Sequence, residues 1–225
     1  DRRPQPFAGF VGCSCVSERL STGVPEIDRE IGGGIDPGSI VLVSAPPASQ
    51  SEALLHATMR ERRTRYVTTR RNENAVRETL SKVIGDAGPG YSVKYAGLDE
   101  PLANVREAIA LVEAEAAIVV DTVDPLERAG DPDSYVTFLN ELKDALISTG
   151  SVGVLHAASS AERAPLRDVT EAFGDLVLEV ELQRNGSKVE HVLSVPKFRA
   201  HELPSERIKL ELSSEVQVDT SRDIA

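Results

Sequence analysis

Two kinds of segment alternate along most of the chain. Short apolar runs are followed by longer segments in which apolar residues recur every three or four positions. The first pattern favours strands that are buried on both faces of a sheet, and the second favours amphipathic helices. The expected strands are 39–44, 65–69, 92–96, 117–120 and 151–155, and the expected helices are 24–31, 52–62, 73–84, 102–113 and 134–149.

The pattern changes after residue 176. Segments 177–182 and 189–195 flank Asn185-Gly186, a dipeptide that strongly favours a hairpin turn. Segments 208–212 and 216–218 predict a second hairpin. The sequence therefore predicts an α/β protein with a mostly parallel central sheet, helices on both faces and a C-terminal antiparallel β extension. We expect an N-terminal arm over 1–20, one domain over 21–220 and a tail over 221–225.

The charge of the chain is strongly negative. Its net charge of −11 comes from 25 basic and 36 acidic residues, so the surface as a whole repels nucleic acid. Acidic excess, scarce lysine and 4% aromatic residues favour adaptation to high salt. A GC-rich genome that favours arginine would give part of the same pattern. The sequence shows neither a membrane-spanning apolar run nor a secretory signal, which predicts a cytoplasmic protein.

The two cysteines, Cys13 and Cys15, stand too close together for an easy disulfide. No further Cys/His pair completes a zinc site, so we expect small core or surface thiols and no bound metal.

A phosphate-binding loop joins a strand to a helix through a glycine-rich turn, and its lysine and hydroxyl groups hold phosphate and Mg²⁺. The segment in that place is Ala45-Pro46-Pro47-Ala48-Ser49-Gln50-Ser51-Glu52. Upstream lie Ser21-Thr22-Gly23-Val24-Pro25-Glu26-Ile27-Asp28, Gly32-Gly33-Gly34 and Pro37-Gly38-Ser39. Together these residues resemble the RecA superfamily, most closely its KaiC-like and RadA-like archaeal branch, including proteins of halophilic archaea. The resemblance covers about 20–218 and implies a P-loop NTPase fold.

The loop departs from the family pattern G-P-P-G-S-G-K-T at the positions that bind phosphate. Ala45, Ala48 and Gln50 replace the three glycines, where side chains hinder close approach and positive φ. Ser51 replaces the lysine, and Glu52 replaces the magnesium-binding hydroxyl. Glu52 would repel a phosphate group about 4 Å away by up to about 4 kcal/mol, or it simply occupies the first helical turn as a favourable anion. On either interpretation the loop is vestigial, and we expect no cofactor.

Other parts of the ATPase are altered as well. The resemblance implies two glutamates after the second strand, but Arg70 and Arg71 stand there, and arginine cannot act as a general base. Asp121 matches the Walker B carboxylate, and it is either a retained metal-site acid or, as we favour, a capping residue at a strand end. Lys197 and Arg199 match a K-x-R motif that reaches a neighbouring subunit's nucleotide. They form either a subunit-interface pair or outward residues on an edge strand.

Two further features complete the sequence picture. Residues 60–65, together with Arg70 and Arg71, form a basic cluster that either binds an anion or acidic partner or, as we favour, is a solvated helix end. His156 lies at the C-terminal edge of the expected sheet, where such folds bind ligands. With neither cysteine nor aspartate near it in sequence, we assign His156 no role.

These observations favour a non-catalytic RecA/KaiC-like pseudo-ATPase over an enzyme. It would be a regulatory or scaffold protein that contacts a protein partner or further copies of itself, in signalling or transcriptional regulation. One alternative is a residual ATPase or nucleotide sensor completed by a partner subunit. Another is a recombinase-accessory DNA-binding module, which the acidic charge opposes.

Overall fold

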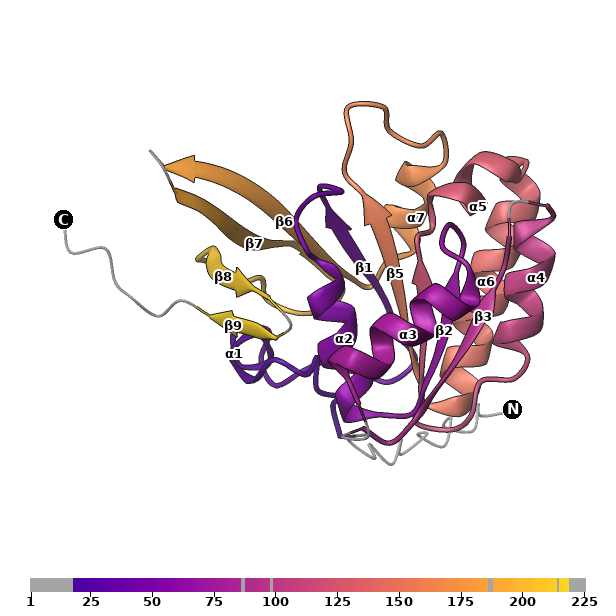
Figure 1. The fold of residues 1–225 in the computed structure, drawn as a ribbon, viewed down its shortest axis with the longest axis horizontal. Helices are drawn as coiled ribbons and strands as arrows, with labels where there is room; N and C mark the ends of the chain where they lie inside the picture. The colour runs from indigo at the N-terminus through magenta and orange to yellow at the C-terminus, as the bar shows by residue number, and fades with distance from the viewer. Residues whose placement is uncertain (1–17, 86–87, 98, 186–187, 214, 219–225) are drawn as a thin grey trace, which may run out of the picture.

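The structure is a computed structural model that describes residues 18–85, 88–97, 99–185, 188–213 and 215–218. In this part of the chain the strands form one sheet in the order β3-β2-β4-β5-β1-β6-β7-β8-β9 (Figure 1). The strands are β1 (Ile40–Ala45), β2 (Thr64–Thr68), β3 (Tyr91–Tyr95), β4 (Ala117–Asp121), β5 (Val152–Ala158), β6 (Leu176–Asn185), β7 (Lys188–Phe198), β8 (Ile208–Leu212) and β9 (Val216–Val218). The strands from β3 to β6 in this order pair in parallel, and β7 to β9 add antiparallel pairs. The predicted α/β class with its antiparallel extension is confirmed.

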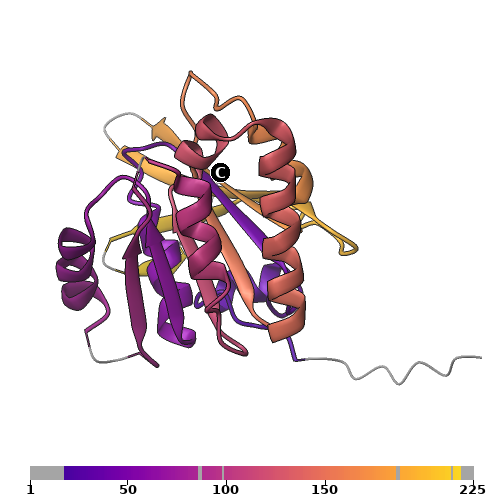
Figure 2. The same cartoon turned by 90° about the vertical axis from the view of Figure 1, so that its right-hand side faces the viewer.

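Helices cover both faces of the sheet (Figures 1 and 2). The helices are α1 (Pro25–Glu30), α2 (Glu52–Glu61), α3 (Glu73–Val83), α4 (Pro101–Ile109), α5 (Asp124–Ala129), α6 (Pro132–Thr149) and α7 (Arg167–Phe173). One buried cluster joins α1, α2 and α3 to one face, and a second joins α4, α5 and α6 to the other. Within the described residues, no helix is long and apolar enough to cross a lipid bilayer.

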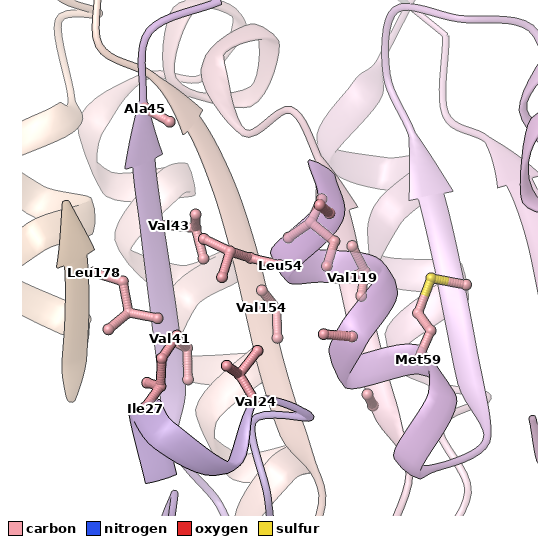
Figure 3. Packing of buried hydrophobic residues seen from close by; sticks show 14 of the residues in the cluster. Val24, Ile27, Val41, Val43, Ala45, Leu54, Met59, Val119, Val154 and Leu178 are labelled. Atoms are coloured by element: carbon pink, nitrogen blue, oxygen red, sulfur yellow. The ribbon is translucent and has the colours of Figure 1, made fainter. Parts of the chain in front are cut away.

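Helix α2 is anchored on the centre of the sheet. Leu54 points toward Val43 and Val154, which come from β1 and β5 (Figure 3). Met59, one helical turn further, is also buried. Each such side chain contributes roughly 1.5–3 kcal/mol by leaving water. This packing fixes the first turn of α2 and therefore the loop that connects it to β1.

The C-terminal strands extend the sheet as predicted. Strand β6 pairs with β7 from Leu176 opposite Phe198 to Asn185 opposite Lys188, and β8 and β9 match the predicted 208–212 and 216–218. Gly186 of the expected turn lies outside the described residues, as do Cys13, Cys15, most of the arm and the tail. Helices α5 and α7 were not predicted, because both are short and the fold buries charged residues in them: Asp124 and Glu127 of α5 and Arg167 of α7.

Candidate functional site

The candidate site lies where β1, β4 and β5 end at the carboxyl edge of the sheet. These strands are neighbours, and Asp121 of β4 is the register partner of His156 of β5. A cavity of about 380 Å³ opens at this edge. It is lined by Ala45, Pro47, Ser51, Glu52, Arg70, Arg71, Asp121, Thr122, Asp124, Arg128, His156, Ala158 and Ser160. Ligands of open α/β sheets bind at this edge, so the position agrees with the fold.

The loop from Pro46 to Ser51 makes a tight turn into α2. The backbone N–H and the hydroxyl of Ser49 both donate to the carbonyl of Pro46, at 3.0 and 2.7 Å. Gln50 follows with φ of 55°, so one of the three family glycine positions has kept a left-handed conformation despite its side chain. That conformation costs a non-glycine residue roughly 1–2 kcal/mol, which the packed ends of the turn must offset.

Ser51 occupies the place of the family lysine and is buried. Its hydroxyl oxygen lies 2.9 Å from Nε2 of His156. Glu52 is the first residue of α2, where the helix dipole favours a carboxylate, and it also lines the cavity. Glu52 therefore lies in the first turn of the helix and also beside the cavity, as the two interpretations of the sequence required.

Asp121 is enclosed by hydrogen-bond donors. One carboxylate oxygen accepts from the Tyr66 hydroxyl at 2.5 Å and from Nη2 of Arg71 at 2.9 Å, and the other accepts from Nδ1 of His156 at 2.8 Å. Burial alone would raise the pKa of Asp121. The hydrogen bonds of His156 and Tyr66 and the charge of Arg71 outweigh burial and hold this pKa well below its usual value. Asp121 is therefore a buried, fully engaged carboxylate.

The two arginines that replace the family glutamates have different surroundings. Arg71 forms an ion pair with Asp121, while Arg70 is exposed and lines the cavity. The same Asp121 contact, with Tyr66 and Glu52 nearby, raises the pKa of Arg71 despite its partial burial, so a permanent cation lies beside the Walker B position.

His156 has partners that were not expected, because the fold brings Asp121 and Ser51 to its two ring nitrogens. Asp121 lies 35 positions away in the chain. The signal in the sequence was indirect: both residues lie toward the carboxyl ends of strands expected to be parallel. Neighbouring parallel strands place such positions side by side. Tyr66 was missed as well, since it reads as an ordinary apolar position of β2.

Lys197 and Arg199 both contact the C-terminal end of α7. Lys197 donates to the carbonyls of Glu171 and Ala172, and Arg199 donates to Ala172 and forms an ion pair with Asp175. Strand β7 lies between β6 and β8 in the sheet, but β8 pairs with it only over His191–Leu193, so at Lys197 the one paired neighbour is β6. The edge-strand interpretation therefore stays open. A role at a subunit interface stays a prediction.

The basic cluster is not a single patch. Strand β2 separates residues 60–65, at its amino end, from Arg70 and Arg71 at its carboxyl end. Arg62 is buried and donates to the Ser21 carbonyl, and Arg63 forms an exposed ion pair with Glu113. The solvated-helix-end interpretation is therefore wrong for Arg62.

Across the part of the chain that the structure describes, no three His, Cys, Asp or Glu side chains gather closely enough to hold a metal ion. A magnesium ion would have to be held through Asp121, whose oxygens already accept from three donors. Glu52 stands where the family supplies a hydroxyl ligand. This set of residues does not fit Mg²⁺ bound to a triphosphate.

His56 gives the protein a pH-dependent stability. It is buried in α2, and this burial, with the Arg60 charge, lowers its pKa from 6.5 to about 4. Between pH 4 and pH 6.5 the His56 ring is protonated in the unfolded chain and neutral in the folded chain. The free energy of unfolding therefore rises with pH across this window, by about 3 kcal/mol. Urea unfolding of wild type and His56→Gln at pH 4.5 and 7 measures the difference. Equal pH dependence in both proteins would contradict the assignment.

Three comparisons place the chain among known proteins. The model of a family of unknown function (DUF7125) matches residues 19–225. DNA repair protein RadA of Mycobacterium tuberculosis strain H37Rv is 28% identical over 205 residues, which cover 83% of this chain and 42% of that protein. RadA of Salmonella typhimurium strain LT2 is 34% identical over 82 residues, 30% of this chain and 18% of that protein. The chain thus spans less than half the length of these relatives.

Among solved structures, a KaiC-like protein of the hyperthermophilic archaeon Pyrococcus horikoshii OT3 superposes with a TM-score of 0.70. The two chains are 15% identical, and the match covers 89% of this chain and 98% of the other. The fold is therefore RecA/KaiC-like, and RadA is a distant homologue. This likeness is strong in shape and weak in sequence, so the chemistry has to be argued from the side chains.

Proposed function

The chain belongs to the family of unknown function DUF7125, and we propose that it is a RecA/KaiC-like protein that has lost nucleotide chemistry and acts through contacts with protein partners. Such a protein is a pseudo-ATPase toward nucleotides, with a regulatory or scaffold role in signalling or transcriptional regulation. The acidic excess further supports a halophilic archaeal source.

One observation carries this proposal. Asp121, at the position where the family orients magnesium, is held by Tyr66, Arg71 and His156 of the same chain. An ionised carboxylate has about four acceptor positions, and three of them are occupied here. A magnesium-bound water would compete with these donors, and the charge of Arg71 beside Asp121 would repel the metal ion. Each hydrogen bond to the carboxylate that such a water displaced would cost roughly 1.5–3 kcal/mol.

The loop adds an independent cost. Ser51 supplies no cation for the β- and γ-phosphates, and its hydroxyl is engaged with His156. Glu52 places a carboxylate on the wall of the same cavity. The free energy that a P-loop draws from its lysine is thus absent, and the Glu52 carboxylate opposes the approach of a polyphosphate to the helix terminus.

Calorimetric titration with Mg·ATP in high salt tests the proposal. We expect no saturable binding below millimolar ATP, because the lysine and the magnesium-binding hydroxyl are missing and side chains replace the three glycines of the loop. The matched variant carries Gln50→Gly, Ser51→Lys and Glu52→Thr, which return the family residues, and it should bind more tightly than wild type. Micromolar binding by the wild-type chain would reject the proposal.

A residual ATPase or nucleotide sensor is the second candidate, and it requires Lys197 and Arg199 to reach a neighbouring subunit. Both side chains instead hydrogen-bond the end of α7 in their own chain. A DNA-binding role draws support from the RadA relatives, which are described as DNA repair proteins. The net charge of −11 opposes it, since binding to phosphate backbones depends on basic groups.

A further inference from the structure

Three side chains at the carboxyl edge form a continuous hydrogen-bonded line. The Ser51 hydroxyl lies 2.9 Å from Nε2 of His156, and Nδ1 of the same ring lies 2.8 Å from Asp121. An ionised carboxylate only accepts hydrogen bonds, so Nδ1 carries the proton and Nε2 presents its lone pair to the Ser51 O–H. A serine, a base and an orienting acid in this geometry activate the serine oxygen as a nucleophile.

We propose that Ser51 is a nucleophile for acyl transfer, with His156 as its general base and Asp121 as the residue that positions His156. The inference goes beyond the loss of nucleotide chemistry, because Ser51, which replaced the lysine, joins His156 and Asp121 in a different reactive group. Its substrate class is a small, neutral carboxylic ester. The cavity of about 380 Å³ admits a small molecule, and the Glu52 carboxylate on its wall disfavours an anionic acyl group.

The backbone around Ser51 suits this role. Ser51 stands between β1 and α2, directly after the left-handed Gln50, so it sits on a sharp strand-to-helix turn. A turn of this kind presents the nucleophile of α/β-hydrolases, whose acid and histidine follow it in the same chain order as Asp121 and His156 here. That is an analogy of local geometry between different folds, and the roles rest on the contacts.

The first turn of α2 offers a donor for a developing oxyanion. The N–H groups of Ala53 and Leu54 donate to the carbonyls of Gln50 and Ser51. The N–H of Glu52 belongs to the first helical turn, whose donors have no acceptor within the helix. The Glu52 N–H directly follows the nucleophile Ser51 in the chain. The positive end of the helix dipole would strengthen its hydrogen bond to the oxyanion.

The proposed hydrolysis of the ester proceeds in two stages, through an acyl group bound to Ser51. The Ser51 oxygen bonds to the ester carbonyl carbon as its proton passes to Nε2 of His156, and the carbonyl electron pair moves to oxygen. Collapse of this intermediate breaks the bond to the alcohol oxygen, which takes the proton from Nε2. Water then attacks the acyl-serine by the same route, and the products are one carboxylic acid and one alcohol.

Tyr66 and Arg71 complete the support for the base. Both donate to the carboxylate oxygen of Asp121 that does not contact His156. They fix the carboxylate plane, so that the other oxygen stays aligned with the ring. Their hydrogen bonds thus act on the nucleophile through two intermediate side chains.

A fluorophosphonate probe applied to the whole wild-type chain tests the proposal. Ser51 should form an oxygen–phosphorus bond with release of fluoride, and mass spectrometry of the digested protein should locate one adduct there. His156→Gln should slow labelling by at least about 100-fold, the usual contribution of a general base. Ser148→Ala is the control, because Ser148 is an exposed serine of α6 that donates to the Ala145 carbonyl and does not line the cavity. Thermal melts show which variants are folded.

The positioning role of Asp121 has its own readout. Nitrogen-15 spectra of the His156 ring should show a proton on Nδ1 in wild type and a shift of this tautomer in Asp121→Asn, together with slower labelling. Two outcomes overturn the proposal. One is folded wild-type protein without an adduct at Ser51, and the other is labelling of Ser51 at the same rate in folded His156→Gln.

Discussion

Replacing Arg167 with methionine is expected to lower the free energy of unfolding by about 3–5 kcal/mol, because it strips two buried carboxylates of their cation. Arg167 pairs with Glu127 at 2.8 Å and with Asp124 at 2.9 Å. The side chain of Glu127 is wholly buried, and that of Asp124 nearly so. The variant would leave one or both of these groups charged without a partner, or force them to bind protons.

The loss should spread through a wider network. Thr170 donates to Glu127 and is hydrogen-bonded to Tyr135, and Arg167 also donates to the Ala158 carbonyl at the end of β5. These contacts tie α7 to α5, α6 and β5, close to the cavity. We therefore expect Arg167→Met to loosen the cavity wall as well as the fold.

Arg163→Met is the matched control for urea unfolding. Arg163 also pairs with two acids, Asp168 and Glu171, but its side chain is 52% exposed. Exposed pairs contribute about 1 kcal/mol or less, so this variant should unfold near wild type. If Arg167→Met is as mild as Arg163→Met, the buried network does not stabilise the fold.

The same network shows why α5 and α7 escaped prediction. The sequences of these helices contain charged residues at positions that the fold buries, such as Glu127 and Arg167. A charged residue in a short segment usually indicates an exposed loop. The burial of Glu127 and Arg167 is tolerable because the two side chains pair with each other across 40 positions of sequence. The centre of the sheet was predictable because β1 and β4 are almost continuously apolar, a pattern that can be recognised without knowing the partners of each residue.

The residues of the candidate site also fall into two groups, those that the sequence located and those that only the fold brings together. The loop 45–52 and Asp121 were located from their spacing, since a phosphate loop and a Walker B strand have fixed places along the chain. The contacts of His156, Tyr66 and Arg71 depend on which strands become neighbours. That order is set by the packing of helices on the two faces, and one sequence does not reveal it. The departures from the family pattern therefore predicted a loss of nucleotide chemistry, while the contacts among Ser51, His156 and Asp121 appear only in the three-dimensional arrangement.

Replacing Asp121 with asparagine is expected to cost about 3 kcal/mol or more of stability. The asparagine amide has one acceptor oxygen, whereas Tyr66, Arg71 and His156 all donate to the aspartate. The amide oxygen can still accept from Tyr66 and Arg71, but the amide nitrogen then faces Nδ1 of His156, so this ring must shift its proton to Nε2 or lose its acceptor. Arg71 also loses its counter-charge. Urea unfolding at pH 7 measures the change. This pH lies far above the depressed pKa of Asp121, so its ionised form is the one compared.

Whether Asp121→Asn lowers or raises the free energy of unfolding distinguishes two roles of Asp121, a metal-site acid and a structural carboxylate. A carboxylate kept to orient a metal is commonly held at a cost in stability, and its removal then leaves the fold unharmed or more stable. A carboxylate that satisfies three donors stabilises the fold, and its removal weakens it. Asp131→Asn provides the control, because Asp131 is an exposed cap at the start of α6 whose amide replacement still accepts from Ser134. A stabilised Asp121→Asn protein would return Asp121 to the role of a metal-site acid and count against the loss of nucleotide chemistry.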